Sequence, residues 1–444
     1  MAFVRKARRG LIAAAALSAV FVAAACGGSG GSPSGGGSAS GSAGGADWTK
    51  QGDIEYWQGK DTSQSGWLQK TIDAFNAQHP NGKVTVHELP DNADQQRQQM
   101  IQNVQIKNPK MAVVSVDVVW TSEFAANSYI VAPPEGSIDT SKWLKAAVDA
   151  ATYFNKLYAI PSTSDGGLLY YRTDLLKKYG FSAPPTTFDE MKQQCDKIIA
   201  GEKDSKLNCF AGQYNKYEGL TVNVAEAINS AGGVIVGDDG KPNVNTPEAQ
   251  KGLGTLVDWF KDGTIPKGAI TWQEEDGRRA FQAGQLVFHR NWGYVYNLAN
   301  KTDGSSKVAG KFAVAPLPGI TVTPGVSSLG GHSFGITSTG ENKGTALDFV
   351  KYMTTAENQK AQALATSSAP VLESLYNDPD LVKAFPMYPT LLKSIQSAKP
   401  RPKVVNYGDV TLAIQDSSYS ALQGQIPTDQ ALQQMQSKLE TLIK

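Results

Sequence analysis

The stretch DIEYWQGKDTSQSGWLQKTIDAFNAQHPNGKVTVHEL, residues 53–89, predicts a strand, a helix and a second strand in succession. Its first residues are rich in large apolar side chains, as in a strand, and four apolar residues between 67 and 75 recur at helical spacing. The Pro-Asn-Gly sequence at 80–82 ends the helix, and Val84 and Val86 alternate as in a strand. Because such a unit forms a right-handed crossover between parallel strands, the stretch indicates an α/β fold.

The rest of the chain continues with both kinds of element. Helical patterns follow at 95–106 and at 173–199, the second split by a proline-rich turn, and the stretch 223–281 is mostly helical. Strand patterns occur at 114–120, 156–164, 167–172, 287–291, 311–318 and 333–338. From Gly344 onward the chain is rich in helices, so the fold class is α/β with additional helices.

The length and charge of the chain restrict its function. Without the first 46 residues the chain keeps roughly 400 residues, more than one hydrophobic core usually serves, so we expect two domains or lobes. Its 42 basic residues nearly balance its 41 acidic ones, and no basic stripe suggests a nucleic-acid partner. We therefore expect a near-neutral globular body, and a monomer.

The N-terminus has the pattern of an export signal. Basic residues at 5, 6, 8 and 9 precede an apolar run, 11–25, which is shorter than the about 20 residues of a membrane span. The run ends in Ala-Ala-Ala-Cys, which resembles a bacterial lipobox, although Ala23 stands where leucine is usual. We expect a lipoprotein signal peptide at 1–25, lipidation of Cys26, and a flexible Gly/Ser-rich tether at 26–46. An ordinary secretory signal with an incidental cysteine is the alternative.

An exported protein is located in an oxidising compartment, which favours a disulfide between the two remaining cysteines. Cys195 and Cys209 close a short loop, and we expect them to form a disulfide rather than remain free thiols. The four histidines have no ligand-like spacing to each other or to the cysteines. We therefore expect no metal and no cofactor.

Polar and aromatic residues follow several predicted strands, where open α/β sheets bind ligands. The residues in these positions are Gln58, Asp61, Asp117, Trp120, Asp165, Trp292 and Tyr294. In the stretch RNWGYVY, 290–296, an extended chain would point Trp292, Tyr294 and Tyr296 to one face, either as core or as a ligand platform. We expect Tyr296 to be a packing residue. Asp117 could instead cap the helix that follows it. Together the set suits a polyhydroxylated ligand, which stacks on rings and bonds to carboxylates.

Five segments in order resemble the extracellular solute-binding proteins of bacterial carbohydrate ABC importers, especially the trehalose- and maltose-binding group. They are VDVVWTSEFA (116–125), DGGLLYYRTDLLKKYG (165–180), EEDGRRAFQAGQLVFHRNWGYVY (274–296), LGGHSFGIT (329–337) and RPKVVNY (401–407). The resemblance implies a two-lobe periplasmic-binding-protein-like fold of type II, with a ligand cleft between lobes joined by a hinge. We assign 47–162 plus about 308–360 to lobe 1 and 163–307 plus about 361–444 to lobe 2.

The same resemblance implies the residues of the site. Asp117 and Asp165 would bond to sugar hydroxyls, Trp292 and Tyr294 would stack on the sugar, Gly330 and Gly331 would approach it through backbone, and Arg401 would close over it. Gln58, Asp61 and Arg97 are further candidates, and for Arg97 a solvated helix position is the alternative. The chain departs from the family pattern at three places that line or border the cleft: Gly293 where proline is frequent, His332 where tryptophan is frequent, and polar residues at 162–164.

We therefore expect a lipid-anchored receptor at the outer face of the cell membrane, which delivers a trehalose- or maltose-like sugar to the transmembrane subunits of an ABC permease. Two alternatives remain at this point. A receptor for a non-carbohydrate solute would use the same architecture. A surface glycosidase would need two carboxyls facing each other across a bond, whereas Glu274, Glu275 and Asp276 are adjacent on one helix. We expect no enzymatic activity.

Overall fold

The computed structural model describes residues 46–61 and 65–443. The expected signal peptide, the lipidated Cys26 and all but the last residue of the expected tether lie outside these residues. The part from Ala46 onward forms one compact unit. Within the described residues no helix is both long and apolar enough to cross a membrane.

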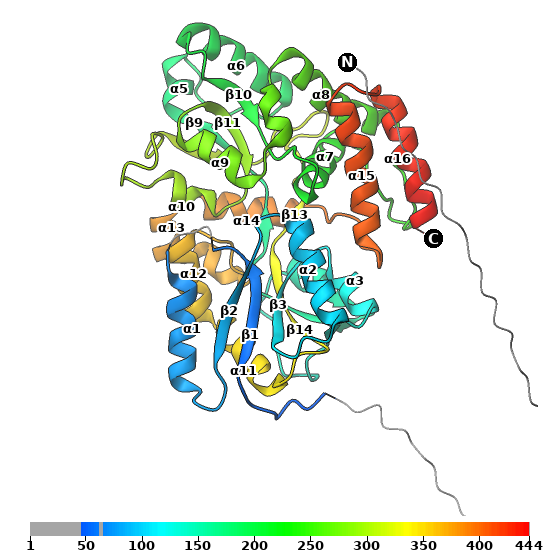
Figure 1. Ribbon diagram of the computed structural model, residues 1–444. Helices are drawn as coiled ribbons and strands as arrows, with labels where there is room; N and C mark the ends of the chain where they lie inside the picture. The colour runs from blue at the N-terminus through cyan, green and yellow to red at the C-terminus, as the bar shows by residue number, and fades with distance from the viewer. Residues whose placement is uncertain (1–45, 62–64, 444) are drawn as a thin grey trace, which may run out of the picture. The chain divides into compact units, whose positions relative to one another are not determined.

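The first sheet is built on the strand-helix-strand unit that opens the chain body (Figure 1). Its order is β2-β1-β3-β14-β4, and β7 also pairs with β14. Its strands are β1 (Ile54–Gly59), β2 (Val84–Leu89), β3 (Met111–Asp117), β4 (Ile130–Val131), β7 (Ala159–Pro161) and β14 (His332–Thr337). β1 is parallel to β2 and to β3, which confirms the predicted parallel arrangement, but β14 runs antiparallel to β3.

The first sheet is buried on both faces, because successive residues of a strand point to opposite sides. Tyr56 belongs to one cluster with Phe75 and Phe349, whereas its neighbour Trp57 belongs to another with Met100. The helices around this sheet are α1 (Trp67–Gln78), α2 (Ala93–Gln105), α3 (Thr121–Ala126), α4 (Lys145–Ala150), α11 (Lys343–Met353) and α12 (Ala356–Thr366). A small hairpin, β5 (Thr152–Tyr153) and β6 (Lys156–Leu157), follows α4.

The second sheet has the order β10-β11-β9-β12. Its strands are β9 (Leu168–Arg172), β10 (Asn208–Ala211), β11 (Leu286–Asn291) and β12 (Phe312–Ala315). β12 pairs antiparallel with β9, so assigning the chain from about 308 to lobe 1 is wrong for this strand. The strand pattern at 311–318 predicted the element, but only the pairing shows to which sheet it belongs.

The second sheet carries most of the remaining helices, which Figure 1 shows around β9, β10 and β11. They are α5 (Thr173–Lys178), α6 (Phe188–Glu202), α7 (Glu218–Ser230), α8 (Pro247–Asp262), the 3₁₀ helix η1 (Lys267–Thr271), α9 (Glu274–Gln282), α10 (Val295–Ala299), α15 (Tyr407–Leu422) and α16 (Thr428–Leu442). The two helices expected at 173–199 are α5 and α6, and the mostly helical stretch 223–281 is confirmed.

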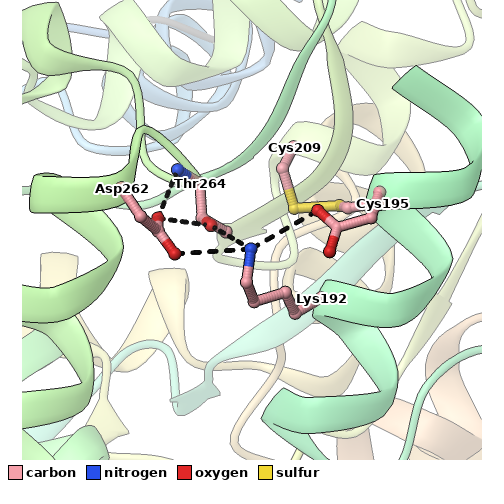
Figure 2. The surroundings of a disulfide bond; sticks show 6 residues. Lys192, Cys195, Cys209, Asp262 and Thr264 are labelled. Carbon is pink, nitrogen blue, oxygen red and sulfur yellow. Dashed lines mark hydrogen bonds and ion pairs between the residues drawn. A yellow bond between two sulfur atoms is a disulfide. The ribbon is translucent and has the colours of Figure 1, made fainter. Parts of the chain in front are cut away.

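The predicted disulfide is present and joins α6 to β10 (Figure 2). Cys195 and Cys209 are both buried, and the loop between them is short. On the same helix, Lys192 reaches Asp262 at the end of α8 at 3.3 Å and the hydroxyl of Thr264 at 3.2 Å. The disulfide therefore reinforces the contact of α6 with the second sheet.

A two-stranded ribbon connects the two sheets. β8 (Asp165–Gly166) and β13 (Leu329–Gly330) are antiparallel, with Asp165 opposite Gly330 and Gly166 opposite Leu329. The remaining elements after α12 are the 3₁₀ helix η2 (Glu373–Asn377), α13 (Pro379–Ala384) and α14 (Tyr388–Ser397). The Ser394 hydroxyl of α14 donates to the Gly167 carbonyl at 2.8 Å, which ties this helix to the ribbon. Two segments far apart in sequence thus pass between the sheets at one place.

Candidate functional site

A cleft of about 470 Å³ opens where the ribbon meets the ends of the strands. Its volume lies within the range of small-molecule sites. Nine of the ten residues expected to bind ligand line this cleft: Gln58, Asp61, Asp117, Asp165, Trp292, Tyr294, Gly330, Gly331 and Arg401. They come from β1 and the residues after it, β3, the two strands of the ribbon, the end of β11 and the segment after α14, so the fold brings together residues from six separate segments of the sequence.

Arg97 is the one expected site residue that does not line the cleft. Its Nε donates to Glu123 of α3 at 2.6 Å, and a second guanidinium nitrogen bonds the other oxygen of the same carboxylate. The pair is largely shielded from solvent, so the expectation of a freely solvated arginine also does not hold. Arg97 joins α2 to α3 instead of facing a ligand.

A buried ion pair holds the ring of Trp292 from behind. The Arg290 guanidinium lies 3.9 Å from the centre of the Trp292 ring. Glu226 of α7 accepts from its Nε at 2.7 Å and its Nη2 at 2.6 Å, and Gln213 accepts from its Nη1 at 3.0 Å. A guanidinium over an aromatic face is a favourable contact, and its bidentate carboxylate fixes it in place. Trp292 is therefore held rigidly at the cleft wall.

The backbone of Trp292 is fixed by a second network. His289 is fully buried, and its Nδ1 lies 2.9 Å from the Ala211 carbonyl, while its Nε2 lies 2.9 Å from the Asn291 amide. Burial lowers the pKa of His289 to about 3, so the ring is neutral and can accept the Asn291 N–H at Nε2. The Asn291 side-chain oxygen in turn accepts the Trp292 N–H at 2.8 Å. Neutral His289 thus holds the Asn291 side chain, which in turn fixes the backbone of Trp292.

The expectation that an extended chain points Trp292, Tyr294 and Tyr296 to one face is wrong. β11 ends at Asn291, and α10 begins at Val295, so the chain is not extended through 292–296. Trp292 and Tyr294 both line the cleft, and the Tyr294 hydroxyl donates to Glu275 at 2.7 Å. Tyr296 instead packs against Phe312 and Phe385, as a packing residue should.

The two glycines expected to approach a ligand are required by their surroundings. A Cβ on Gly330 would lie 2.7 Å from the Trp292 ring, closer than such contacts allow. Gly331 has φ +114°, which disfavours any other residue, and a Cβ there would lie 2.3 Å from the Thr163 carbonyl. The ribbon can therefore pass directly beneath the aromatic wall only because both positions are glycine.

Asp165 is half-buried beside this wall without a basic side chain bonded to it. Its carboxylate accepts the Gly166 N–H at 3.2 Å and the Gly293 N–H at 3.4 Å. Burial raises the pKa of Asp165 to about 7 from its ordinary 3.8, although these two N–H groups oppose the change. Proline at position 293, frequent in the resembling family, could not donate this N–H. Glycine at position 293, in place of proline, therefore provides an N–H that hydrogen-bonds the Asp165 carboxylate.

Arg401 connects the two sheets electrostatically. Its Nη2 lies 3.3 Å from the carboxylate of Asp117 at the end of β3, and its Nη1 bonds Glu218 at the start of α7. Asp117 also accepts the Val119 N–H at 3.1 Å, but α3 begins at Thr121 and has no side-chain cap, so the alternative that Asp117 caps this helix is wrong. Burial raises the pKa of Glu218 to about 7, although Arg401 opposes the rise. The Arg401 Nε is buried with no described partner and remains available to an acceptor.

Several lining residues were not expected from the sequence. They include Lys60, Asp91, Gln96, Glu218, Gln273, Glu274, Glu275, Asp276, Arg279, Gln362, Thr366 and Ser368. Glu274 to Asp276 were weighed only as glycosidase carboxyls, and the helix starts at 218 and 274 gave no sign of facing a ligand. His332 and Thr163, from the departing segments, also line the cleft. Trp120 is buried against Phe124 and does not. Among the described residues no group of His, Cys, Asp and Glu is placed to hold a metal ion.

Comparisons with known proteins agree with this architecture. The chain is 33% identical over 392 residues to a probable ABC transporter-binding protein of Deinococcus radiodurans, covering 86% of this chain and 90% of that protein. A galactooligosaccharide-binding protein of Bacillus subtilis is 23% identical over 313 residues, 68% of this chain and 70% of that protein. The maltose-bound structure of T. maritima MalE3 matches with a TM-score of 0.83 and 32% identity, covering 88% of this chain and 99% of that one.

These similarities confirm the predicted two-lobe α/β fold and the binding, non-enzymatic class of the chain. The family described as bacterial extracellular solute-binding protein matches residues 70–390, which is most of the chain. Membership in that family also indicates an exported protein. The chain belongs to the bacterial extracellular solute-binding proteins.

Proposed function

We propose that this chain is the lipid-anchored receptor of an ABC sugar importer and binds a disaccharide or oligosaccharide of the trehalose or maltose kind. The observation that carries the proposal is the rigid Trp292 ring at the wall of a cleft that also presents carboxylates and Arg401. Sugars offer C–H faces that suit an aromatic ring and hydroxyls that suit carboxylates and guanidinium groups. The likeness to the maltose-bound MalE3 supports the choice of sugar class.

The strength of such a site follows from its contacts. A hydrogen bond to a charged group contributes about 1.5–3 kcal/mol. A few of these, with one aromatic stack, reach the about −8 kcal/mol that corresponds to micromolar affinity. Asp117, Asp165 and Arg401 are the charged groups we assign to sugar hydroxyls, with Gln58 and Asp61 as further contacts.

Binding is proposed to close the two lobes about the ribbon. We assign 47–162 with about 332–360 to the first lobe, and 163–331 with about 361–444 to the second. Arg401 supports this mechanism, because it contacts Asp117 from the first sheet and Glu218 from the second. A sugar shifts the equilibrium only by its greater affinity for the closed form. The closed form would then dock on the transmembrane subunits of the permease.

The membrane attachment is part of the same proposal. The lipobox-like sequence before Cys26 supports a diacylated N-terminus, and the Gly/Ser-rich stretch after it supports a tether with a reach of about 25 Å. Mass spectrometry of the membrane fraction tests this directly. The proposal expects a diacylglyceryl mass on Cys26, and Cys26→Ser should release the protein from the membrane.

A thermal-shift screen of residues 46–444 tests the sugar class. The panel should contain trehalose, maltose, maltodextrins, sucrose, cellobiose and monosaccharides, with amino acids as controls. A ligand at 100 times its dissociation constant adds about 2.7 kcal/mol of stability, which raises the midpoint by a few degrees. A rise with one disaccharide supports the proposal. No rise with any sugar, or a rise with an amino acid, would move the ligand outside carbohydrates.

A further inference from the structure

The cleft carries an excess of negative charge. Its acidic lining residues are Asp61, Asp91, Asp117, Asp165, Glu218, Glu274, Glu275 and Asp276. Its basic lining residues are Lys60, Arg279 and Arg401. A concave site lined mainly by one sign of charge concentrates its field on whatever enters.

Part of this charge is balanced by local partners. Arg401 lies between Asp117 and Glu218, and Arg279 contacts Asp276 at 2.7 Å. Glu275 is paired with Arg278 at 2.5 Å, and Arg278 itself does not line the cleft. These groups present little net charge to a ligand.

Two carboxylates are different. Asp165 accepts only backbone N–H groups, and Glu274 accepts the Tyr217 hydroxyl at 2.6 Å, so neither is ion-paired with a described basic side chain. Arg290 acts on Asp165 electrostatically, but its charge is already neutralised by two hydrogen bonds to Glu226. Above about pH 7, where Asp165 is ionised, Asp165 on the ribbon and Glu274 on α9 therefore add negative charge to the cleft, as do Asp61 and Asp91, which follow β1 and β2.

Asp165 and Trp292 lie next to one another in a geometry that suits a cation. A Cβ on Gly330 would lie 2.7 Å from the Trp292 ring and 3.3 Å from the Cβ of Asp165, so both side chains border the same glycine. A carboxylate beside an aromatic face binds an ammonium group by a charge-assisted hydrogen bond and by attraction to the ring. The same carboxylate repels a phosphate or a sugar acid.

We propose that the cleft selects by charge, accepting uncharged saccharides and saccharides with a protonated amine and rejecting anionic ones, with Asp165 as the residue that discriminates. This inference rests on the proposed function and adds the chemical class of its ligand. An uncharged sugar donates a hydroxyl to Asp165. An amino-substituted sugar places its ammonium group there and neutralises the carboxylate charge.

Isothermal titration calorimetry with matched probes at about pH 8, where Asp165 is ionised and an aliphatic amine is still largely protonated, tests the inference. The probes are trehalose, 6-amino-6-deoxytrehalose and trehalose 6-phosphate, with maltose, an amino-deoxymaltose and maltobionate as a second series. We expect the amine to bind at least as tightly as the neutral sugar and the anion to bind weaker by about tenfold or more, because like charges in a cleft oppose binding. The anion's deficit should shrink in about 0.5 M salt, where screening is strong.

Variants separate discrimination from folding. Asp165→Asn keeps the shape but removes the charge, and it should reduce the amine-to-anion affinity ratio by about tenfold, as expected for one lost charge contact. Asp189→Asn makes the same change of net charge at an exposed position on α6 outside the cleft, and it should leave the ratio unchanged. A role limited to folding would change all three affinities together and not their ratio.

The outcomes distinguish the two proposals. If the anion binds as tightly as the neutral sugar, or if Asp165→Asn leaves the ratio unchanged, the charge inference is wrong while the sugar receptor stands. If no probe of either series binds, the inference and the proposed sugar class both fail. Binding of only the amines would support charge selection and overturn the assignment to uncharged disaccharides.

Discussion

The Arg290 guanidinium stacks 3.9 Å from the centre of the Trp292 ring, and Glu226 holds it there through two hydrogen bonds. The three side chains form a layer in which the ion pair is buried and the aromatic ring faces the cleft. The platform is therefore part of the folded core and does not depend on a ligand to order it. Such preorganisation lowers the entropic cost of binding.

Glu226→Gln should destabilise the fold, because it leaves the Arg290 charge buried without its partner. Breaking a buried pair typically costs about 3–5 kcal/mol. Chemical denaturation should therefore show a fall of this size in the unfolding free energy. Glu341→Gln removes the exposed partner of Lys50 and should have no measurable effect. Equal stability of the two variants would show that the pair does not support the platform.

Gly330→Ala should weaken sugar binding by about tenfold, because the added methyl must displace the Trp292 ring. The backbone of Gly330 does not require a positive φ, so the effect comes from the ring and not from backbone strain. Gly254→Ala on α8 is the matched control, since nothing lies within 4 Å of its added Cβ, and it should leave affinity unchanged. Unchanged calorimetric affinity in Gly330→Ala would contradict the close approach of ribbon and platform.

Replacing both Cys195 and Cys209 by alanine should lower the unfolding free energy by about 3 kcal/mol, the chain-entropy value for a loop of this length. Sugar affinity should not change, because neither cysteine lines the cleft. Denaturation and titration of the same preparation measure both quantities. A large loss of affinity would mean that α6 and β10 help to shape the site.

Asp165 should give the protein a characteristic dependence of stability on pH. Burial raises the pKa of Asp165 to about 7, whereas in the unfolded chain it titrates near 3.8. Between these values the folded state holds one more proton than the unfolded state, so stability falls as pH rises from about 4 to 7. Asp165→Asn removes this contribution.

The difference between wild type and Asp165→Asn isolates this residue from Glu218, whose raised pKa acts in the same direction. Denaturation curves at several pH values between about 4 and 8 should show the variant gaining stability relative to wild type as pH rises. A difference that does not vary with pH would contradict a half-buried, titrating Asp165.

Much of the fold could be predicted from local sequence patterns, whereas features that depend on long-range contacts could not. The strand, helix and strand at 53–89 are visible in sequence because hydrophobic periodicity is local. The pairing of β12 with β9 depends on long-range register, and nothing near residue 312 shows it. Likewise β11 ends at Asn291, whose side chain makes a tertiary hydrogen bond to the Glu274 carbonyl that no local pattern shows, so the extended pattern at 292–296 misled.

The candidate site was predicted where a residue type and a strand end coincided. Asp117, Asp165 and Trp292 satisfy this rule, and the resemblance to a known family added Gly330, Gly331 and Arg401. Glu218 had no such sign, because a glutamate at a helix start is usually a solvated end group. Arg97 shows the opposite error, since its partner Glu123 is distant in sequence and appears only in the folded chain.

The most direct test of the account is calorimetric titration of trehalose and maltose into the wild type and into Trp292→Ala, with Tyr296→Ala as the packing control. We expect saturable micromolar binding of at least one sugar to the wild type, and a loss of at least about 2 kcal/mol in Trp292→Ala, the size of an aromatic anchor. Tyr296→Ala should lose stability but keep affinity, because this ring packs on Phe312 and Phe385. Wild-type affinity in a folded Trp292→Ala would contradict the assignment of Trp292 as the platform.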